Sequence, residues 1–128
     1  MNLKTIFKRL ILLDLSLIIL IIVAVFFESK EVADFNMYFE NDYSNALLII
    51  VGIGLLIYLI NLFLLYRFIS IGKQMYLIVF VLIIILSLIV GAGAVDPWLY
   101  VIDGLGWSVS GALLILLYFS PIKKEFEK

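Results

Sequence analysis

The chain has 128 residues, a hydrophobic content of 66% and a mean hydropathy of +1.24. A soluble domain of this size could not bury so much apolar surface, so these values indicate an integral membrane protein. Cysteine and histidine are both absent, which excludes disulfides, thiolate metal sites and histidine-ligated haem. The net charge is −1 without a basic surface, so we expect no nucleic-acid partner and no cofactor.

Four long apolar runs follow one another along the chain, at 10–27, 46–68, 75–95 and 98–119. Each is long enough to cross a hydrocarbon layer as a helix, which takes about 20 residues. They predict one all-α domain over residues 1–128, an antiparallel bundle of four transmembrane helices surrounded by lipid.

The positive charges separate by side of the membrane. Most precede the first span, lie between the second and third, or follow the fourth: Lys4, Lys8, Arg9, Arg67, Lys73, Lys123, Lys124 and Lys128. Only Lys30 falls in the connection 28–45, which is otherwise acidic. Because positively charged short loops stay in the cytoplasm, we expect both termini inside and 28–45 outside.

The first span, 10–27, contains one carboxylate, Asp14. A carboxylate at a helix centre costs about 2.5–3.5 kcal/mol, and each Leu, Ile, Phe or Val returns about 0.3–0.6 kcal/mol, so the apolar neighbours still insert this helix. The bulky residues at 25–27 do not suit signal cleavage, so we expect the helix to be retained. We expect an ion pair at the inner surface between Asp14 and a nearby basic side chain: Lys8, Arg9, Arg67 or Lys73.

Asp14 is also a candidate ion-coupling group. A single carboxylate in the first of four short helices resembles the small multidrug resistance exporters, which use theirs for proton–drug exchange. Their residue is a glutamate set deeper in the helix, and the flanking pattern of this chain differs.

The outer connection, 28–45, is polar but contains spaced apolar residues. Val32, Phe35 and Phe39 have helical spacing, which predicts a short helix lying on the outer interface. Asp42, Ser44 and Asn45 are suited to cap the second span.

The second and third spans each contain small or polar residues. Gly54, Tyr58 and Asn61 share one helical face of the second span, and Asn61 is a candidate intramembrane polar site. Ser87 and Gly91 lie four residues apart in the third span, as in close helix contacts. We expect Gly54, Ser87 and Gly91 to be helix-packing positions, with the two spans joined as a tight hairpin.

The fourth span begins after Asp96, an expected cap, at Pro97. At 100° per residue, one stripe of this helix holds polar and aromatic side chains, and small residues flank it. The stripe is Asp96, Asp103, Trp107 and Ser110, and the flanking helix-packing candidates are Gly104, Ser108 and Gly111. This side is expected to face protein, and the opposite side to face lipid, through Ile102, Leu105, Val109, Leu113 and Leu116.

Asp103 is the sharpest candidate for function, since an ionisable residue within a span indicates a functional site. Two interpretations stay open. Either Asp103 binds a cation or proton in an outward-facing polar pocket, or it is hydrogen-bonded to neighbouring groups and fixes packing.

Near the end of the chain, residues 118–126 read Tyr118-Phe119-Ser120-Pro121-Ile122-Lys123-Lys124-Glu125-Phe126. With the last two spans, this tail resembles small four-helix bacterial inner-membrane proteins without an assigned role. The resemblance implies a bacterial inner membrane and transfers no functional residue.

No catalytic motif is present, so we expect no enzyme. The favoured hypothesis is a non-enzymatic subunit or accessory of a membrane assembly, acting through helix contacts with a membrane-protein partner. The alternatives are a small homo-oligomeric transporter or channel using Asp103 or Asp14, and an immunity-type protein against a pore-forming toxin.

Overall fold

The computed structural model describes residues 2–39, 44–90 and 93–127, and this part of the chain is helical without any strand. The elements in order are α1 (Leu3–Val25), α2 (Lys30–Phe39), α3 (Ser44–Tyr66), α4 (Ser70–Val90), α5 (Pro97–Phe119) and a 3-10 helix, η1 (Pro121–Phe126). The predicted packing residue Gly91 and the predicted cap Asp42 lie outside the described residues.

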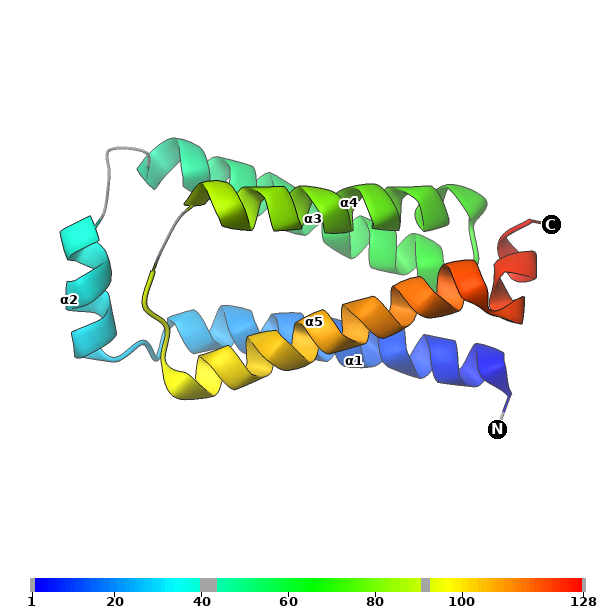
Figure 1. Ribbon diagram of the computed structural model, residues 1–128, viewed down its shortest axis with the longest axis horizontal. Coiled ribbons are helices and arrows are strands. Elements are labelled where there is room, and N and C mark those ends of the chain that lie inside the picture. The colour runs from blue at the N-terminus through cyan, green and yellow to red at the C-terminus, as the bar shows by residue number, and fades with distance from the viewer. Residues whose placement is uncertain (1, 40–43, 91–92, 128) are drawn as a thin grey trace.

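The four long helices are arranged as two pairs. α1 packs most extensively on α5 and α3 on α4, with smaller contacts of α1 with α3 and of α4 with α5. Figure 1 shows the two pairs as two layers, with both chain termini at one end of the molecule and α2 at the other. We call these the terminal end and the α2 end.

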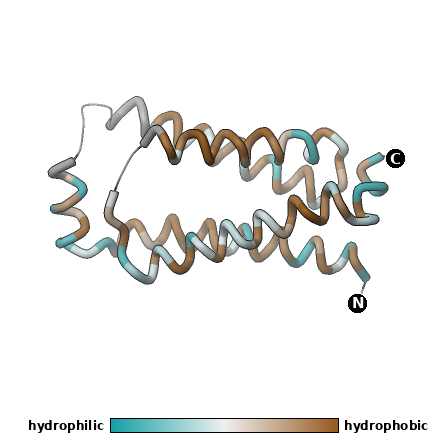
Figure 2. Tube along the Cα trace, viewed as in Figure 1, coloured by the Kyte–Doolittle hydropathy of each residue, from teal (hydrophilic) through white to brown (hydrophobic). Residues whose placement is uncertain are grey.

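Three helices are long and apolar enough to cross a membrane on their own, through 49–66 of α3, 70–88 of α4 and all of α5. α1 meets the same criterion only together with α2, from which it is bent by 82°. Lys8, Arg9 and Asp14 lower the apolar content of α1. The described chain therefore has three such helices, or four if the bent pair counts as one. Figure 2 shows the hydrophobic stretches along the long helices.

The buried core is concentrated towards the terminal end. Among the residues of α3, α4 and α5 whose burial the structure describes, the buried ones lie in the halves nearest that end: Tyr58, Asn61, Leu62, Leu65, Gly72, Tyr76, Val79, Val109, Ser110, Leu113 and Leu117. The other half of α5 has no buried residue after the Asp96 cap. Figure 1 shows that the two helix pairs lie closer together at the terminal end.

This packing corrects the predicted rotation of α5. Leu105 is 52% exposed, as expected of a residue facing lipid, but Val109 and Leu113 are buried against the other helices. The aliphatic side of the second half of α5 therefore faces protein. α5 packs there against α1 and η1.

The reversal between α3 and α4 depends on an unusual backbone conformation at Phe68. Its φ is 57°, the left-handed region that ends helices and normally takes glycine. The amides of Phe68 and Ile69 donate to the carbonyls of Leu65 and Leu64, so the last turn of α3 is capped as in a Schellman motif. α3 consequently ends at Tyr66, two residues before the predicted limit.

The terminal end is closed by the C-terminal segment. Ile122 and Phe126 of η1 are 2% exposed. The rings of Phe7, Phe68 and Phe126 form a cluster with centroid distances of 5.7, 6.0 and 5.4 Å. Lys4 and Glu125 add a 2.8 Å ion pair between α1 and η1. The chain thus folds back across the helix ends.

The α2 end is held by α2 itself, the predicted short helix. The Asn36 amide donates to the carbonyl of Ala94 (3.0 Å) and accepts from its backbone N–H (2.9 Å). Asp96 adopts the extended conformation of an N-cap for α5, but its carboxylate accepts from the backbone N–H of Ser29 (3.0 Å) and makes no capping bond to α5. Asp96 therefore occupies the predicted N-cap position of α5, but its side chain joins α5 to the start of α2 and does not bond the first turn of α5.

Candidate functional site

A buried polar cluster lies between the two helix pairs, with one side chain from each long helix. It consists of Asp14 of α1, Tyr58 of α3, Tyr76 of α4 and Ser110 of α5. Asp14 is 2% exposed, Tyr76 is fully buried, and Tyr58 and Ser110 are each 8% exposed. We call these four residues the Asp14 cluster.

Four oxygen–oxygen contacts connect the Asp14 cluster. The Tyr58 hydroxyl lies 2.6 Å from Oδ2 of Asp14, 3.2 Å from the Ser110 hydroxyl and 3.3 Å from the Tyr76 hydroxyl. The Ser110 hydroxyl lies 3.4 Å from Oδ1 of Asp14. Both carboxyl oxygens are therefore hydrogen-bonded, and the available chemistry is the binding and exchange of protons.

The helical repeat of α1 brings Asp14 into the core. Phe7, Ile11, Asp14 and Leu17 follow at spacings of three or four residues and are all buried, so they form one face against the other helices. The expected inner-surface ion pair is therefore wrong. Asp14 is hydrogen-bonded to hydroxyls, and the Lys8 ammonium instead lies 4.5 Å from the ring centre of Tyr66.

Asn61 lies next to this cluster and has a structural partner. In the amide orientation that satisfies both of its ends, Asn61 donates to the carbonyl of Gly72 and accepts from the N–H of Tyr76, both at 2.9 Å. Asn61 thus holds the first turns of α4, and with them Tyr76, against α3.

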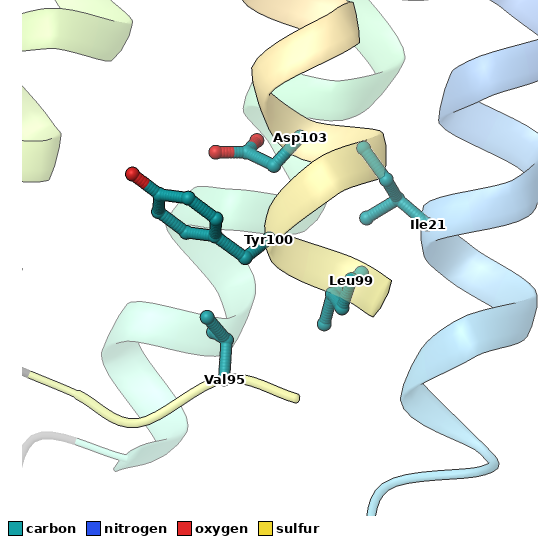
Figure 3. Close-up of a pocket in the computed structure, with 5 residues that line it drawn as sticks. All are labelled: Ile21, Val95, Leu99, Tyr100 and Asp103. Atoms are coloured by element: carbon teal, nitrogen blue, oxygen red, sulfur yellow. The ribbon is translucent and has the colours of Figure 1, made fainter. Parts of the chain in front are cut away.

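Asp103 lies apart from the Asp14 cluster, in the first half of α5, which has no buried residue. Its carboxylate is exposed and accepts from the indole N–H of Trp107 on the same helix (3.2 Å). With Ile21 of α1 and Tyr100, Asp103 borders a shallow surface pocket of about 280 Å³ (Figure 3). The stripe predicted for α5 is divided, since Ser110 is buried and Asp103 is not.

Among the described residues, the predicted packing glycines do not lie close to a neighbouring helix of this chain. A Cβ added at Gly54, Gly104 or Gly111 would meet no atom within 4 Å. Ser87 and Ser108 are exposed and donate to carbonyls of their own helices. Within the monomer the close approach occurs instead at Gly72, where an added Cβ would lie 2.9 Å from Cβ of Leu64.

Sequence reasoning missed the tyrosines and Ser110 as members of the site. A signal was present, because Tyr58 shares a face with Asn61 and each is a polar group in an otherwise apolar span. Polar groups within membrane helices usually find partners on neighbouring helices. The sequence does not show which helix faces pack against each other, so these side chains could not be grouped into one site.

Among the described residues, no group of three aspartate or glutamate side chains is placed to hold a metal ion. No protein-family model, curated protein or solved structure matches the chain. The site is therefore interpreted from its own geometry.

Proposed function

We propose that the protein resides in a bacterial inner membrane, with four antiparallel spanning helices and both termini in the cytoplasm. The burial of Asp14 supports α1 as the fourth span, because its carboxyl is turned away from lipid. The distribution of charge supports the orientation. Lys4, Lys8, Arg67 and Lys73 belong to the terminal end, and α2 begins with Lys30-Glu31 at the opposite end.

We further propose that the protein is a non-enzymatic accessory subunit that binds a transmembrane helix of a partner protein. The observation that carries this proposal is the exposed carboxylate of Asp103, beside Gly104 and Ser108, in a membrane-spanning helix. A carboxylate facing lipid is costly, and small residues four apart allow another helix to approach closely. We call this surface the Asp103 face.

The charge of the Asp103 face determines the partner's chemistry. A second copy docked through the same face would bring two carboxylates together, which is unfavourable in a medium of low dielectric constant. A helix bearing a lysine, an arginine or a hydrogen-bond donor at the matching depth would instead satisfy Asp103. The proposed partner is therefore a different membrane protein with such a residue in a span.

Site-specific photo-crosslinking in intact membranes tests this proposal. A crosslinker at Ser108 is expected to form an adduct with another membrane protein, and Asp103→Leu in the same chain should abolish it. A crosslinker at Ile78, which is 58% exposed on α4, is the matched control and should not give that adduct.

The identity of the adduct decides between the hypotheses. A partner with a basic or donor residue in the crosslinked span supports the accessory role. Self-adducts alone would contradict it and favour the homo-oligomeric transporter. An adduct unaffected by Asp103→Leu would show that the Asp103 face does not select the partner.

A further inference from the structure

When Asp14 is ionised, the Asp14 cluster has fewer hydroxyl protons than oxygen–oxygen contacts. The cluster has four oxygen–oxygen contacts within hydrogen-bond distance. With Asp14 ionised, only the hydroxyls of Tyr58, Tyr76 and Ser110 carry protons. Three protons cannot occupy four contacts, so one pair of oxygens would face each other without a hydrogen between them.

A proton on Asp14 completes the set. In place of the bond that Tyr58 donates to the ionised carboxylate, Asp14 then donates from Oδ2 to Tyr58. Tyr58 donates to Ser110, and Ser110 donates to Oδ1 of Asp14, which closes a ring. Tyr76 donates to the second lone pair of Tyr58. Each of the four oxygen–oxygen contacts then holds one hydrogen, and such chains of hydrogen bonds strengthen one another.

The surroundings of Asp14 favour the same state. The titratable groups facing it are Tyr58 of α3 and Tyr76 of α4, and the group from α5 is the neutral Ser110. The hydrogen bonds of Asp14 involve no cation, and Glu125 of η1 is paired with Lys4. A buried carboxylate without a cation is costly, so a neutral acid suits this position better.

We propose that the Asp14 cluster is a proton-binding site, in which a proton taken from water and held by Asp14 fastens the helix pair α1 and α5 to the pair α3 and α4. The ligand is the proton itself. Its release would leave a buried negative charge and a broken ring at the contact between the pairs. This inference is independent of the partner helix proposed for the Asp103 face.

The pH dependence of unfolding in detergent tests the proposal. An unfolded aspartate loses its proton near pH 4, so above that pH the folded state would bind one more proton than the unfolded state. The unfolding equilibrium constant should then rise about tenfold per pH unit until folded Asp14 releases its proton. Asp14→Asn should remove this dependence, because its amide donates and accepts without titrating.

Asp34→Asn is the matched control, since Asp34 is exposed on α2 and belongs to neither proposed site, and it should keep the wild-type slope. Equal slopes for the wild type and Asp14→Asn would overturn the proposal. Infrared spectroscopy at neutral pH supplies a second readout, the C=O stretch of a protonated carboxylic acid. Its absence from the wild type would also overturn the proposal. If Asp14→Asn fails to fold, the infrared spectrum of Asp103→Asn is the test. A C=O band that persists in this variant supports Asp14 as the source of the band, and loss of the band contradicts the proposal.

Discussion

The Tyr58 hydroxyl and Oδ2 of Asp14 lie 2.6 Å apart, although 44 residues separate them in the sequence. Asp14 belongs to the helix pair α1 and α5, and Tyr58 to the pair α3 and α4. Their hydrogen bond therefore connects the two layers of the molecule. Lipid tails supply little hydrophobic drive for helices to associate, so such polar contacts carry a large share of the specificity.

Asn61→Leu is expected to lower the free energy of unfolding by about 1–3 kcal/mol, since it removes two buried side-chain hydrogen bonds, to the carbonyl of Gly72 and the amide of Tyr76. Denaturant titration in detergent measures the change. Gln74→Leu replaces an exposed amide on α4 and should have little effect. Similar losses in the two variants would contradict the bridging role of Asn61.

Gly72→Ala should destabilise the protein by about 1–3 kcal/mol, because the new methyl group would lie 2.9 Å from Cβ of Leu64 at the crossing of α3 and α4. Gly54→Ala is the matched control. Nothing lies within 4 Å of its added Cβ, so the higher helix propensity of alanine should stabilise α3 by up to about 1 kcal/mol. Thermal unfolding of the monomer measures both variants. The unfolding temperature should fall for Gly72→Ala and rise for Gly54→Ala.

Phe126→Ala should cost about 3–5 kcal/mol, since it empties a buried position against Phe7 and Phe68. Phe119→Ala removes the same side chain from a position that is 86% exposed, and its effect should stay within about 0.5 kcal/mol. If the two variants unfold at the same temperature, η1 does not close the terminal end.

The long apolar helices could be predicted because a membrane helix must satisfy its own backbone and present apolar side chains to lipid. Three of them are long and apolar enough to cross a membrane on their own, and α1 only together with α2. The start of α5 at Pro97 and the short helix α2 followed from local signals in the same way. The end of α3 could not be predicted from local signals, because Phe68 takes a left-handed conformation that is usually found at glycine. Aromatic packing with Phe7 and Phe126 accompanies that conformation.

The candidate site was less predictable than the long helices. Helical periodicity shows which residues share one face of a helix, but not which other helix packs against that face. Asp103 and Ser110 share one stripe of α5, yet only Ser110 is buried, since the described core of α5 lies in its second half. Asp14 was expected beside lysines or arginines because of its sequence neighbours. Its buried face with Phe7 and Ile11 instead directs it towards Tyr58.

Asn36→Ala should loosen α2 from the connection before α5, because both hydrogen bonds to the backbone of Ala94 are lost. Each is worth about 1 kcal/mol, so amide exchange at Ala94 should become several-fold faster. Asp34→Ala, an exposed change on the same helix, should leave that rate unaltered. Unchanged exchange in Asn36→Ala would mean that other contacts hold α2.

The contact of Asp14 with Tyr58 is tested most directly by a double-mutant cycle of Asp14→Ala and Tyr58→Phe, measured as free energies of unfolding in detergent. The hydrogen bond between the two helix pairs predicts a coupling energy of at least about 1 kcal/mol. A parallel cycle of Asp103→Ala and Tyr58→Phe should be additive, because Asp103 is bonded to Trp107 and not to Tyr58. Additivity within about 0.5 kcal/mol for Asp14 and Tyr58 would contradict a polar cluster that joins the helix pairs.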